Sequence, residues 1–414
     1  MPQPLLIKNA RVWRNLAPPS GQPEARELVV SDRVLDTAPP GAIPVDLDGY
    51  TIFPGFINAH DHLELNHFPR TKFRERFDNA HQWGEDVSAR LNDAPFRELR
   101  AYPLEDRLFI GGLKNLFCGA TTVAHHNPPH RALFHADFPV RVLKQYGWAH
   151  SLHFSAEQEI RDSYAKTPPD VPWFIHLAEG TDEVAAGEYR RLKASGCVGS
   201  NTVLIHGVGL TDADVADAAP RIRGLVWCPS TNIDLLGATA DSIRWANAGG
   251  RLALGSDSRL TADGDLLDEM RRSADATGFA RQSRMILKMV TTNAAEILGV
   301  PDAGHLQPGA HADFVVIRSS EGDVCALCQS RRADLALVVK GGVPQLGDPA
   351  VMAKFRHIPT VTAVLDGVPK AIHRDLARRL LRCRLRERGL EMDEDALATG
   401  HVPSLRRLFP RGVG

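Results

Sequence analysis

Short apolar segments that each end in polar residues recur along the middle of this chain. Seven are recognisable, separated by longer stretches with helical patterning, at 51–59, 120–124, 148–154, 173–177, 203–205, 224–227 and 252–254. Such alternation of strand and helix is typical of a parallel sheet, either open or closed into a barrel. An eight-stranded barrel needs one more strand. The shortfall lies between Phe154 and Trp173, where 157–166 has a helical pattern, so the sequence gives this strand no position.

Both ends of the chain have a different texture. Short alternating apolar segments separated by Gly and Pro stand at 5–7, 27–30 and 43–47, and the same pattern returns at 312–317 and 335–340. Short apolar segments separated by Gly and Pro are typical of short β-strands. They indicate one small β-rich domain to which both chain ends contribute. Beyond Pro349 the sequence predicts basic amphipathic helix, which we expect to dock its leucine stripe on the protein itself.

The overall composition excludes several classes of partner. Apolar residues make up 43% and charged residues 24%, and 49 Lys plus Arg against 50 Asp plus Glu give a net charge of -1. A chain so nearly neutral has no strong positive electrostatic potential to attract nucleic acid or an anionic membrane. A small-molecule substrate is therefore expected. No run reaches the ~18 apolar residues of a membrane span, and no secretory signal is visible, which predicts a cytoplasmic protein. The six scattered Cys, including Cys325 and Cys328, are expected to be reduced.

The strongest chemical signal is the pair His60 and His62, directly after the apolar segment 51–59. Residues i and i+2 of an extended chain point to the same side, so the two imidazoles can converge on one ion. His176 ends another predicted strand and Glu179 follows it, while His206 and Asp257 end two more. The carboxyl ends of parallel strands share one face, where barrels of this kind hold their active sites. Imidazole and carboxylate are ligands of zinc and iron.

This order of motifs resembles the amidohydrolase superfamily, in the branch of the cytosine, guanine and S-adenosylhomocysteine deaminases and the chlorohydrolases. The resemblance covers about residues 1–345 and is carried by segments 54–62, 176–179, 228–232, 255–258 and 304–313. It implies a (β/α)8 TIM-type barrel, distorted here around strands 3 and 4, with a small β-sandwich built from both chain ends. The corresponding boundaries are 1–52 and 303–348 for the sandwich, 53–302 for the barrel and 349–414 for a helical, basic extension.

The resemblance also implies roles for individual residues. His60, His62, His176 and Asp257 would bind one divalent metal ion per chain, zinc or iron. Glu179 would shuttle protons, Asp257 would take a proton from the attacking water, and His206 would orient that water or polarise the substrate. No lysine between His62 and His176 ends a clear strand, so a bridging carboxylated lysine and a second metal are not expected.

The implied activity is hydrolysis of a carbon–nitrogen bond outside peptides, with deamination of a heterocyclic or amidine-like small molecule by metal-activated hydroxide as the leading reaction. Two alternatives stay open: a cyclic amide hydrolase or chlorohydrolase with the same metal site, and a non-catalytic scaffold on the same fold. Family analogy suggests a homodimer. Candidate substrate contacts, chosen for their places after predicted strands or in loops near them, are His125, His126, Trp83 and Asn232.

Overall fold

The computed structural model of the chain describes residues 2–15, 23, 25–262, 264–277, 283–319 and 324–392. Its centre contains parallel strands joined by helices, which confirms the predicted α/β class. The parallel strands are β6 (Phe56–Asp61), β7 (Ala120–His125), β8 (Arg141–Val142), β9 (Gly147–Ser151), β10 (Trp173–Leu177), β11 (Thr202–His206), β12 (Gly224–Trp227) and β13 (Leu252–Leu254).

These parallel strands form two ladders. One has the order β6-β7-β8 and the other β13-β12-β11-β10-β9. A parallel bridge between Asp61 and Asp257 links the β6 and β13 edges, whereas the ladders of the described chain do not pair β8 with β9. The carboxyl ends of β6 and β13 therefore lie side by side.

The eighth parallel strand does not lie between Phe154 and Trp173, where the sequence pattern fell short. Residues between Phe154 and Trp173 contain helix α4 (Glu157–Lys166), and the additional strand is β8, earlier in the chain. Because β8 has only two residues, it shows no alternation that a sequence pattern could reveal. With β8 in place, the irregular junction between β8 and β9 falls at the third and fourth parallel strands, where the chain was expected to depart from regularity.

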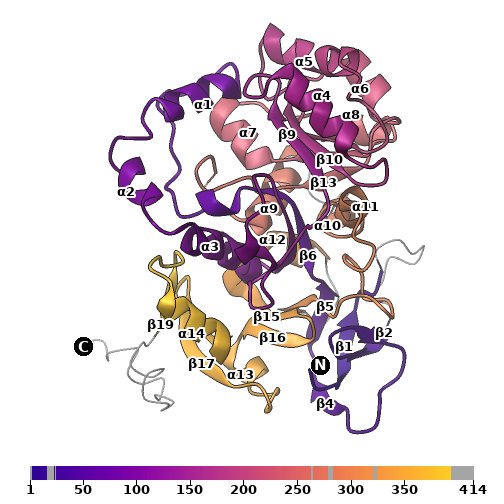
Figure 1. Cartoon of the computed structure of the whole chain (residues 1–414). Helices are drawn as coiled ribbons and strands as arrows, with labels where there is room; N and C mark the ends of the chain where they lie inside the picture. Colours follow the sequence, from indigo (N-terminus) through magenta and orange to yellow (C-terminus); the bar gives the residue numbers. More distant parts are fainter. Residues whose placement is uncertain are drawn as a thin grey trace.

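Helices connect the parallel strands and cover their outer faces, as α4, α5, α6 and α8 do in the upper half of Figure 1. Local signals start some of them: the side chain of Asp182 accepts a hydrogen bond from Ala185 N and caps α5. Besides α4, the helices of this part are α1 (Ala80–Ser88), α2 (Phe96–Arg100), α3 (Leu104–Phe117), α5 (Glu183–Ala194), α6 (Asp212–Ala218), α7 (Pro229–Leu236), α8 (Ser242–Asn247), α9 (Leu266–Thr277), α10 (Ser283–Met289) and α11 (Thr292–Leu298). The 3-10 turns are η1 (Leu63–Leu65) and η2 (Arg131–Phe134).

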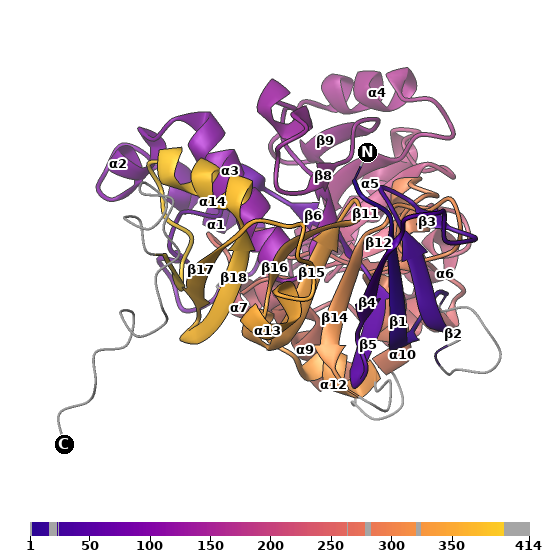
Figure 2. The same cartoon turned by 90° about the horizontal axis from the view of Figure 1, so that it is seen from below.

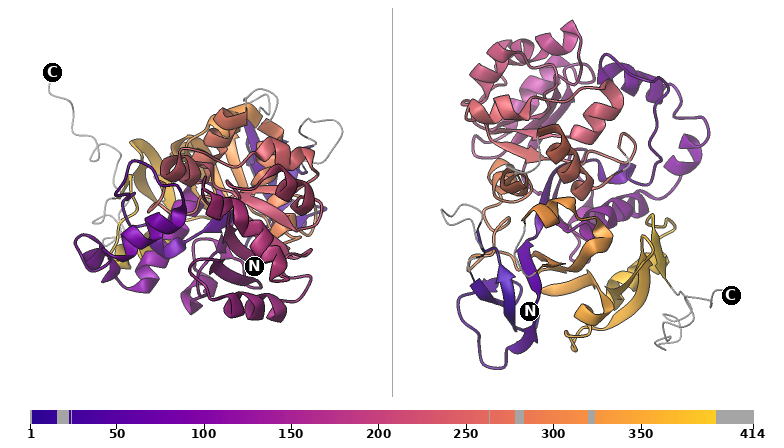
Figure 3. Two further views of the ribbon diagram at one scale, coloured as in Figure 1. Left: turned by 90° about the horizontal axis from the view of Figure 1, so that it is seen from above. Right: turned by 180° about the vertical axis from the view of Figure 1, so that it is seen from behind.

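Strands from both chain ends share one eleven-stranded sheet, with the order β19-β17-β18-β16-β15-β14-β5-β1-β2-β3 and β4 paired to β1. Figure 2 shows this row of strands, and Figure 3 shows its first and last parts in the same half of the molecule. Its strands are β1 (Leu5–Val12), β2 (Ala25–Val30), β3 (Val34–Leu35), β4 (Ile43–Asp46), β5 (Tyr50–Pro54), β14 (Phe314–Arg318), β15 (Leu335–Lys340), β16 (Val343–Gly347), β17 (Thr360–Leu365), β18 (Val368–His373) and β19 (Leu390–Met392). α12 (Val324–Gln329), η4 (Arg332–Asp334), α13 (Pro349–Met352) and α14 (Arg374–Arg382) complete the fold.

The segment after Pro349, expected to be helical, contains three strands in addition to α13 and α14; residues 393–414 lie outside the described residues. The hairpin of β17 and β18 turns at Asp366 and Gly367, whose φ angles are 50° and 80°. An Asp-Gly pair favours this tight turn and is the signal that predicts the hairpin. Helix α14 buries Leu376, Ala377 and Leu380, so its apolar stripe docks on the protein, as predicted.

An ion cluster ties this last segment to the loop after β13. The Glu387 carboxylate accepts hydrogen bonds from Arg259 at 2.7 and 2.9 Å and from Arg332 at 2.6 Å, and all three side chains are buried. Buried charges need such pairing to offset their lost hydration. Among the described residues, none of the helices is both long and apolar enough to cross a membrane.

Candidate metal centre and active site

Four side chains predicted as metal ligands meet at the carboxyl ends of the parallel strands. His60 Nε2 and His62 Nε2 each lie 3.5 Å from Asp257 Oδ1, and His60 Nε2 lies 3.3 Å from His176 Nε2. One donor atom from each of His60, His62 and Asp257 falls within 4.8 Å of the others. All four side chains are buried. The structure thus brings together residues that are far apart in the sequence.

Hydrogen bonds behind the cluster orient its members. His176 Nδ1 donates to the carbonyl oxygen of His150 at 2.9 Å, which leaves the Nε2 lone pair directed toward His60. The hydroxyls of Thr231 and Thr261 donate to Asp257 Oδ2 at 3.1 and 2.9 Å, which leaves Oδ1 to face the histidines. Partners of this kind fix the tautomer and direction of a metal ligand.

The backbone is strained at three of these strand ends. Ala178, His206 and Asp257 have φ angles of 54°, 76° and 51°, in the left-handed region that non-glycine residues rarely adopt. Each such residue costs of order 1–3 kcal/mol, and strain of this kind gathers at functional sites. Here it turns the side chains of His206 and Asp257 toward the cluster instead of continuing the strand.

Burial keeps His60, His176 and His206 neutral. It lowers the pKa of His60, places the pKa of His176 well below its ordinary value, and lowers the pKa of His206 to about 3. Burial alone would raise the pKa of Asp257, but its hydrogen bond to His60 and the neighbouring His62 lower it overall. Neutral imidazole and ionised carboxylate are the forms that bind a metal.

Glu179 and His206 stand next to the cluster. His206 Nε2 is 3.4 Å from Glu179 Oε2, and the Asn232 side-chain amide donates to His206 Nδ1 at 3.0 Å. Neutral His206 therefore carries its proton on Nε2, facing Glu179. Burial, followed by the charges of Asp257 and Glu188, raises the pKa of Glu179 well above its ordinary value. A carboxyl group of this kind can hold a proton near neutral pH and transfer it.

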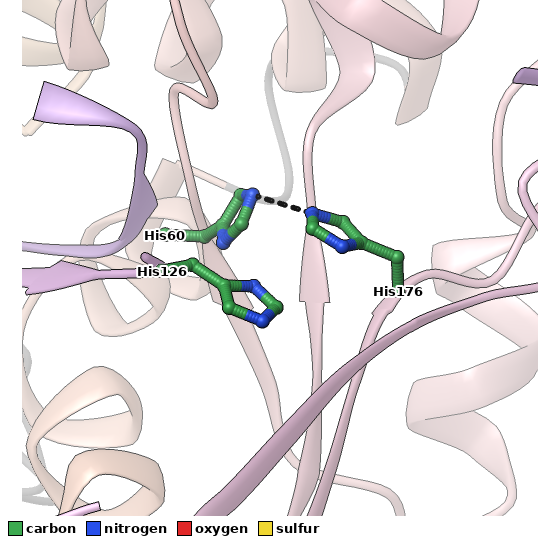
Figure 4. Close-up of side chains that lie close together, drawn as sticks. All are labelled: His60, His126 and His176. Atoms are coloured by element: carbon green, nitrogen blue, oxygen red, sulfur yellow. Dashed lines mark hydrogen bonds between the residues drawn. The ribbon is translucent and has the colours of Figure 1, made fainter. Parts of the chain in front are cut away.

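His126, predicted as a substrate contact or as a ligand of a second metal, is packed into the same cluster. Figure 4 shows its ring together with those of His60 and His176, and these three offer a second group of donors within 4.8 Å. His126 Nε2 donates to the carbonyl oxygen of Ala149, while its buried Nδ1 has no hydrogen-bond partner among the described residues. His126 comes just after β7, so its strand-end position was the signal that could have suggested a ligand role.

A cavity of about 400 Å³ opens onto the cluster. Its wall includes His62, His176, Glu179, His206 and Asp257. Two larger cavities, of about 760 and 730 Å³, contain none of these residues, so the smaller cavity is the candidate active site.

The predicted substrate contacts divide between the cavity and the layer behind it. Trp83 lines the cavity. Asn232 is buried behind His206, because helix α7 begins at Pro229 and turns that side chain inward. His125 is also buried, with its Nδ1 facing Leu63 N and Glu64 instead of the cavity. The structure therefore does not place His125 and Asn232 where they would touch a substrate.

Other residues at the site were not predicted. His150 lines the cavity and supplies the carbonyl that orients His176. It lies close to the end of β9, which the sequence pattern placed at residue 154 instead of Ser151. Beneath β6, the buried Lys114 ammonium donates to Asp61 Oδ2 at 3.2 Å and to Ser256 Oγ at 2.9 Å. This bond network fixes the residue between His60 and His62. A lysine within a helix gives no sequence signal for such a contact.

Comparisons with known proteins agree with this geometry. Residues 158–345 match the model of the amidohydrolase family. The chain is 24% identical over 425 residues to a 5-methylthioadenosine/S-adenosylhomocysteine deaminase of Desulforudis audaxviator, covering 82% of this chain and 92% of that protein. It is 26% identical to an 8-oxoguanine deaminase of Pseudomonas aeruginosa, over 52% of this chain and 54% of the relative.

Solved structures show the same fold. An adenosine deaminase from Xanthomonas campestris with bound zinc aligns with a TM-score of 0.67 and 19% identity, over 86% of this chain and 98% of the other. An atrazine chlorohydrolase from Arthrobacter aurescens complexed with zinc aligns with a TM-score of 0.66 and 19% identity, over 82% and 94%. The chain is therefore similar to the amidohydrolase family in residues 158–345 and shares its fold with these zinc-bound enzymes.

Proposed function

We propose that this protein is a metal-dependent hydrolase of non-peptide carbon–nitrogen bonds that deaminates a heterocyclic or amidine-like small molecule. The observation that carries the proposal is Glu179, a carboxyl with a 14% exposed side chain 3.4 Å from His206, on a cavity that opens onto three histidines and Asp257. The deaminase relatives and the zinc-bound structural neighbours support the same reaction class.

His60, His62, His176 and Asp257 would hold one divalent ion, with zinc as the expected metal. The donor set fits: three imidazoles and one carboxylate are typical zinc ligands, and Nε2 of His60 and Nε2 of His62 each lie 3.5 Å from Asp257 Oδ1. When bound, such an ion acts as a Lewis acid that activates water for attack at neutral pH.

The protein's own side chains would move the protons. Asp257 Oδ1 accepts the proton of the attacking water, since Oδ2 is occupied by the two threonine hydroxyls. Glu179, whose raised pKa favours its protonated form, donates to the departing nitrogen. His206 presents its Nε2 proton to the group that gains negative charge during attack, because Asn232 occupies the other ring nitrogen.

We also propose the finer architecture. The parallel strands would form a (β/α)8 barrel interrupted between β8 and β9, spanning residues 53–302. The sheet from both ends would fold as a small β-sandwich. The family's structures and the bridge between Asp61 and Asp257 support this arrangement.

The substitution Glu179→Gln tests the proposed reaction. It removes the ionisable proton but keeps the shape, so we expect zinc content to stay at the wild-type level and turnover to fall at least 100-fold. Metal content is measured by mass spectrometry, and ammonia, amine and chloride release are measured across purines, pyrimidines and triazines. Glu85→Gln, an exposed carboxylate paired with His153, is the matched control. Near-normal turnover in Glu179→Gln would refute the proton-transfer role.

A further inference from the structure

The cavity has an apolar wall besides its polar lining. Six apolar side chains line it, Leu65, Trp83, Val87, Leu91, Phe154 and Leu260, and three of them, Leu65, Trp83 and Leu260, belong to one hydrophobic cluster. The one polar atom of the Trp83 indole, Nε1, donates to the carbonyl oxygen of Thr71 at 2.9 Å, so only ring carbon remains for a ligand. Val87 and Leu260 are buried, whereas Phe154 is 44% exposed and stands at the outer side. An apolar group of a ligand that binds there would be removed from water, and this burial is favourable.

The same cavity has no positive side chain to receive an anion. Its lining, within the described chain, includes neither lysine nor arginine, while Glu179, Glu188 and Asp257 contribute carboxyl groups. Three arginines close to lining residues in the sequence are engaged elsewhere: Arg259 bonds to Glu387 at 2.7 and 2.9 Å, and Arg74 and Arg90 both bond to Asp86. A phosphate or carboxylate in this space would lose hydration without a counter-charge and would face like charges.

The apolar wall is fastened to the loop that carries Glu179. Ala80 N, at the start of α1, donates to the carbonyl oxygen of Glu179 at 2.9 Å. The Asn79 side chain caps α1 and donates to Asp182 Oδ1 at 3.0 Å. Trp83 and Val87 lie on this same helix. The distance between the proton-transferring group and the apolar wall is therefore fixed by one hydrogen-bonded unit, which suits a substrate with a defined length.

We propose that the substrate is an uncharged heterocycle that presents its reacting amine to Glu179 and an apolar substituent, such as an alkyl, thioether or aryl group, to the wall of Trp83, Val87 and Leu260. Substrates with a phosphate or a free carboxylate at the substituent end are excluded. This inference rests on the proposed deaminase-type function and adds the chemical class of the non-reacting part.

The experiment compares substrates that share a reacting ring. Zinc-loaded enzyme is given adenosine, 5′-methylthioadenosine, adenosine 5′-monophosphate and S-adenosylhomocysteine, and a second set of amino-triazines bearing isopropyl or carboxymethyl groups. For the ring that reacts, we expect kcat/KM to be at least about 100-fold higher with the apolar than with the anionic substituent. Equal or faster turnover of the anionic member overturns the inference while leaving the deaminase function standing. Absence of ammonia or amine from every compound refutes the proposed function itself, and this inference with it.

Binding gives a second readout that does not depend on turnover. In calorimetric titrations of the Glu179→Gln protein, the apolar-substituted member of each pair should bind at least about tenfold tighter than the anionic one. Equal affinity would overturn the inference.

Variants locate the preference on the wall. Val87→Ser should lower the ratio of apolar to unsubstituted kcat/KM about tenfold. Trp83→Phe, which keeps an apolar ring, should retain most of the preference. Val184→Ser, the same change at an exposed position of α5, is the control and should leave the ratio unchanged. An unaltered ratio in Val87→Ser would contradict the assigned wall.

Discussion

His126 lies face to face with His176, with ring centroids 4.4 Å apart and an angle of 10° between the planes. Burial lowers its pKa well below the ordinary value, so the ring is neutral. One nitrogen is bonded to Ala149 and the other has no hydrogen-bond partner in the described chain. A buried lone pair without a donor is costly, and a cation beside His60 would satisfy it. At the scale of single residues, this is the feature that most alters the expected ligand set.

We therefore expect His126→Ala to weaken zinc binding about 10- to 100-fold, the range seen when residues that support a metal site are removed. Competition with a chelator of known affinity measures the change. His357→Ala, an exposed histidine distant in sequence, serves as the control. Wild-type affinity in His126→Ala would show that His126 only packs against the ligands.

Glu269 on α9 is a buried carboxyl group whose protonation makes the stability of the fold depend on pH. Burial raises its pKa to about 8, and its carboxylate accepts a hydrogen bond from Ser230 N. The folded state keeps this proton up to about pH 8, whereas the unfolded chain releases it near pH 4.3. The folded state thus binds more protons between these values, and stability falls as pH rises through that window.

Glu269→Gln removes this dependence. The stability of the variant relative to the wild type should increase by about 2–4 kcal/mol between pH 5 and pH 8. Urea unfolding at both pH values tests it, with Glu296→Gln, an exposed side chain, as the control. A constant difference between variant and wild type would contradict the assignment.

At the scale of elements, helix α3 packs tightly against the turn that follows His62. A Cβ atom added at Gly111 would overlap the carbonyl oxygen of Leu63, whereas one added at Gly187, in the middle of α5, would meet nothing within 4 Å. Two helical glycines thus exist for different reasons. The first permits close approach of a helix to the metal-binding segment, and the second has no steric purpose.

The same substitution should therefore have opposite effects. Gly111→Ala should destabilise the protein by about 1–3 kcal/mol through overpacking. Gly187→Ala should stabilise it by about 0.5–1 kcal/mol, because alanine favours helix. Thermal and urea unfolding measure both. Destabilisation of equal size in the two variants would mean that the contact with Leu63 does not matter.

Elements also show what the sequence could and could not predict. Strands β6, β10, β11 and β13 were predicted with their terminal polar residues, because apolar runs that end in His or Asp are conspicuous. β8 was missed because a strand of two residues is too short to show an alternating apolar pattern. The β17–β18 hairpin was missed because its Asp366-Gly367 turn was overlooked. The bond between Lys114 and Asp61 was beyond prediction, since neither residue type identifies its partner.

On the scale of the whole molecule, the last segment is held by charge as well as by strand pairing. Glu387 joins Arg259, two residues after Asp257, to Arg332 in η4, just before β15. Glu387→Gln would leave the buried Arg259 guanidinium without its carboxylate partner, whereas Arg332 would keep its ion pair with Asp366. We expect a loss of about 3–5 kcal/mol in unfolding free energy.

The exposed pair of Arg251 and Glu296 is the matched control for that change, and Glu296→Gln should cost less than about 1 kcal/mol. Urea unfolding of both variants decides the comparison. A loss in Glu387→Gln as small as in Glu296→Gln would show that water or a rearranged side chain replaces the carboxylate.

The eleven-stranded sheet has a consequence for biosynthesis. Strand β5, which runs through Gly55 into the strand bearing His60, pairs with β14, and residues 314–318 leave the ribosome only after all the parallel strands have been made. Pairings between distant parts of a chain form slowly and late. The nascent polypeptide should thus complete the pairing of β5 only after residues 314–318 have been made, and until then its unpaired strands would be exposed to aggregation.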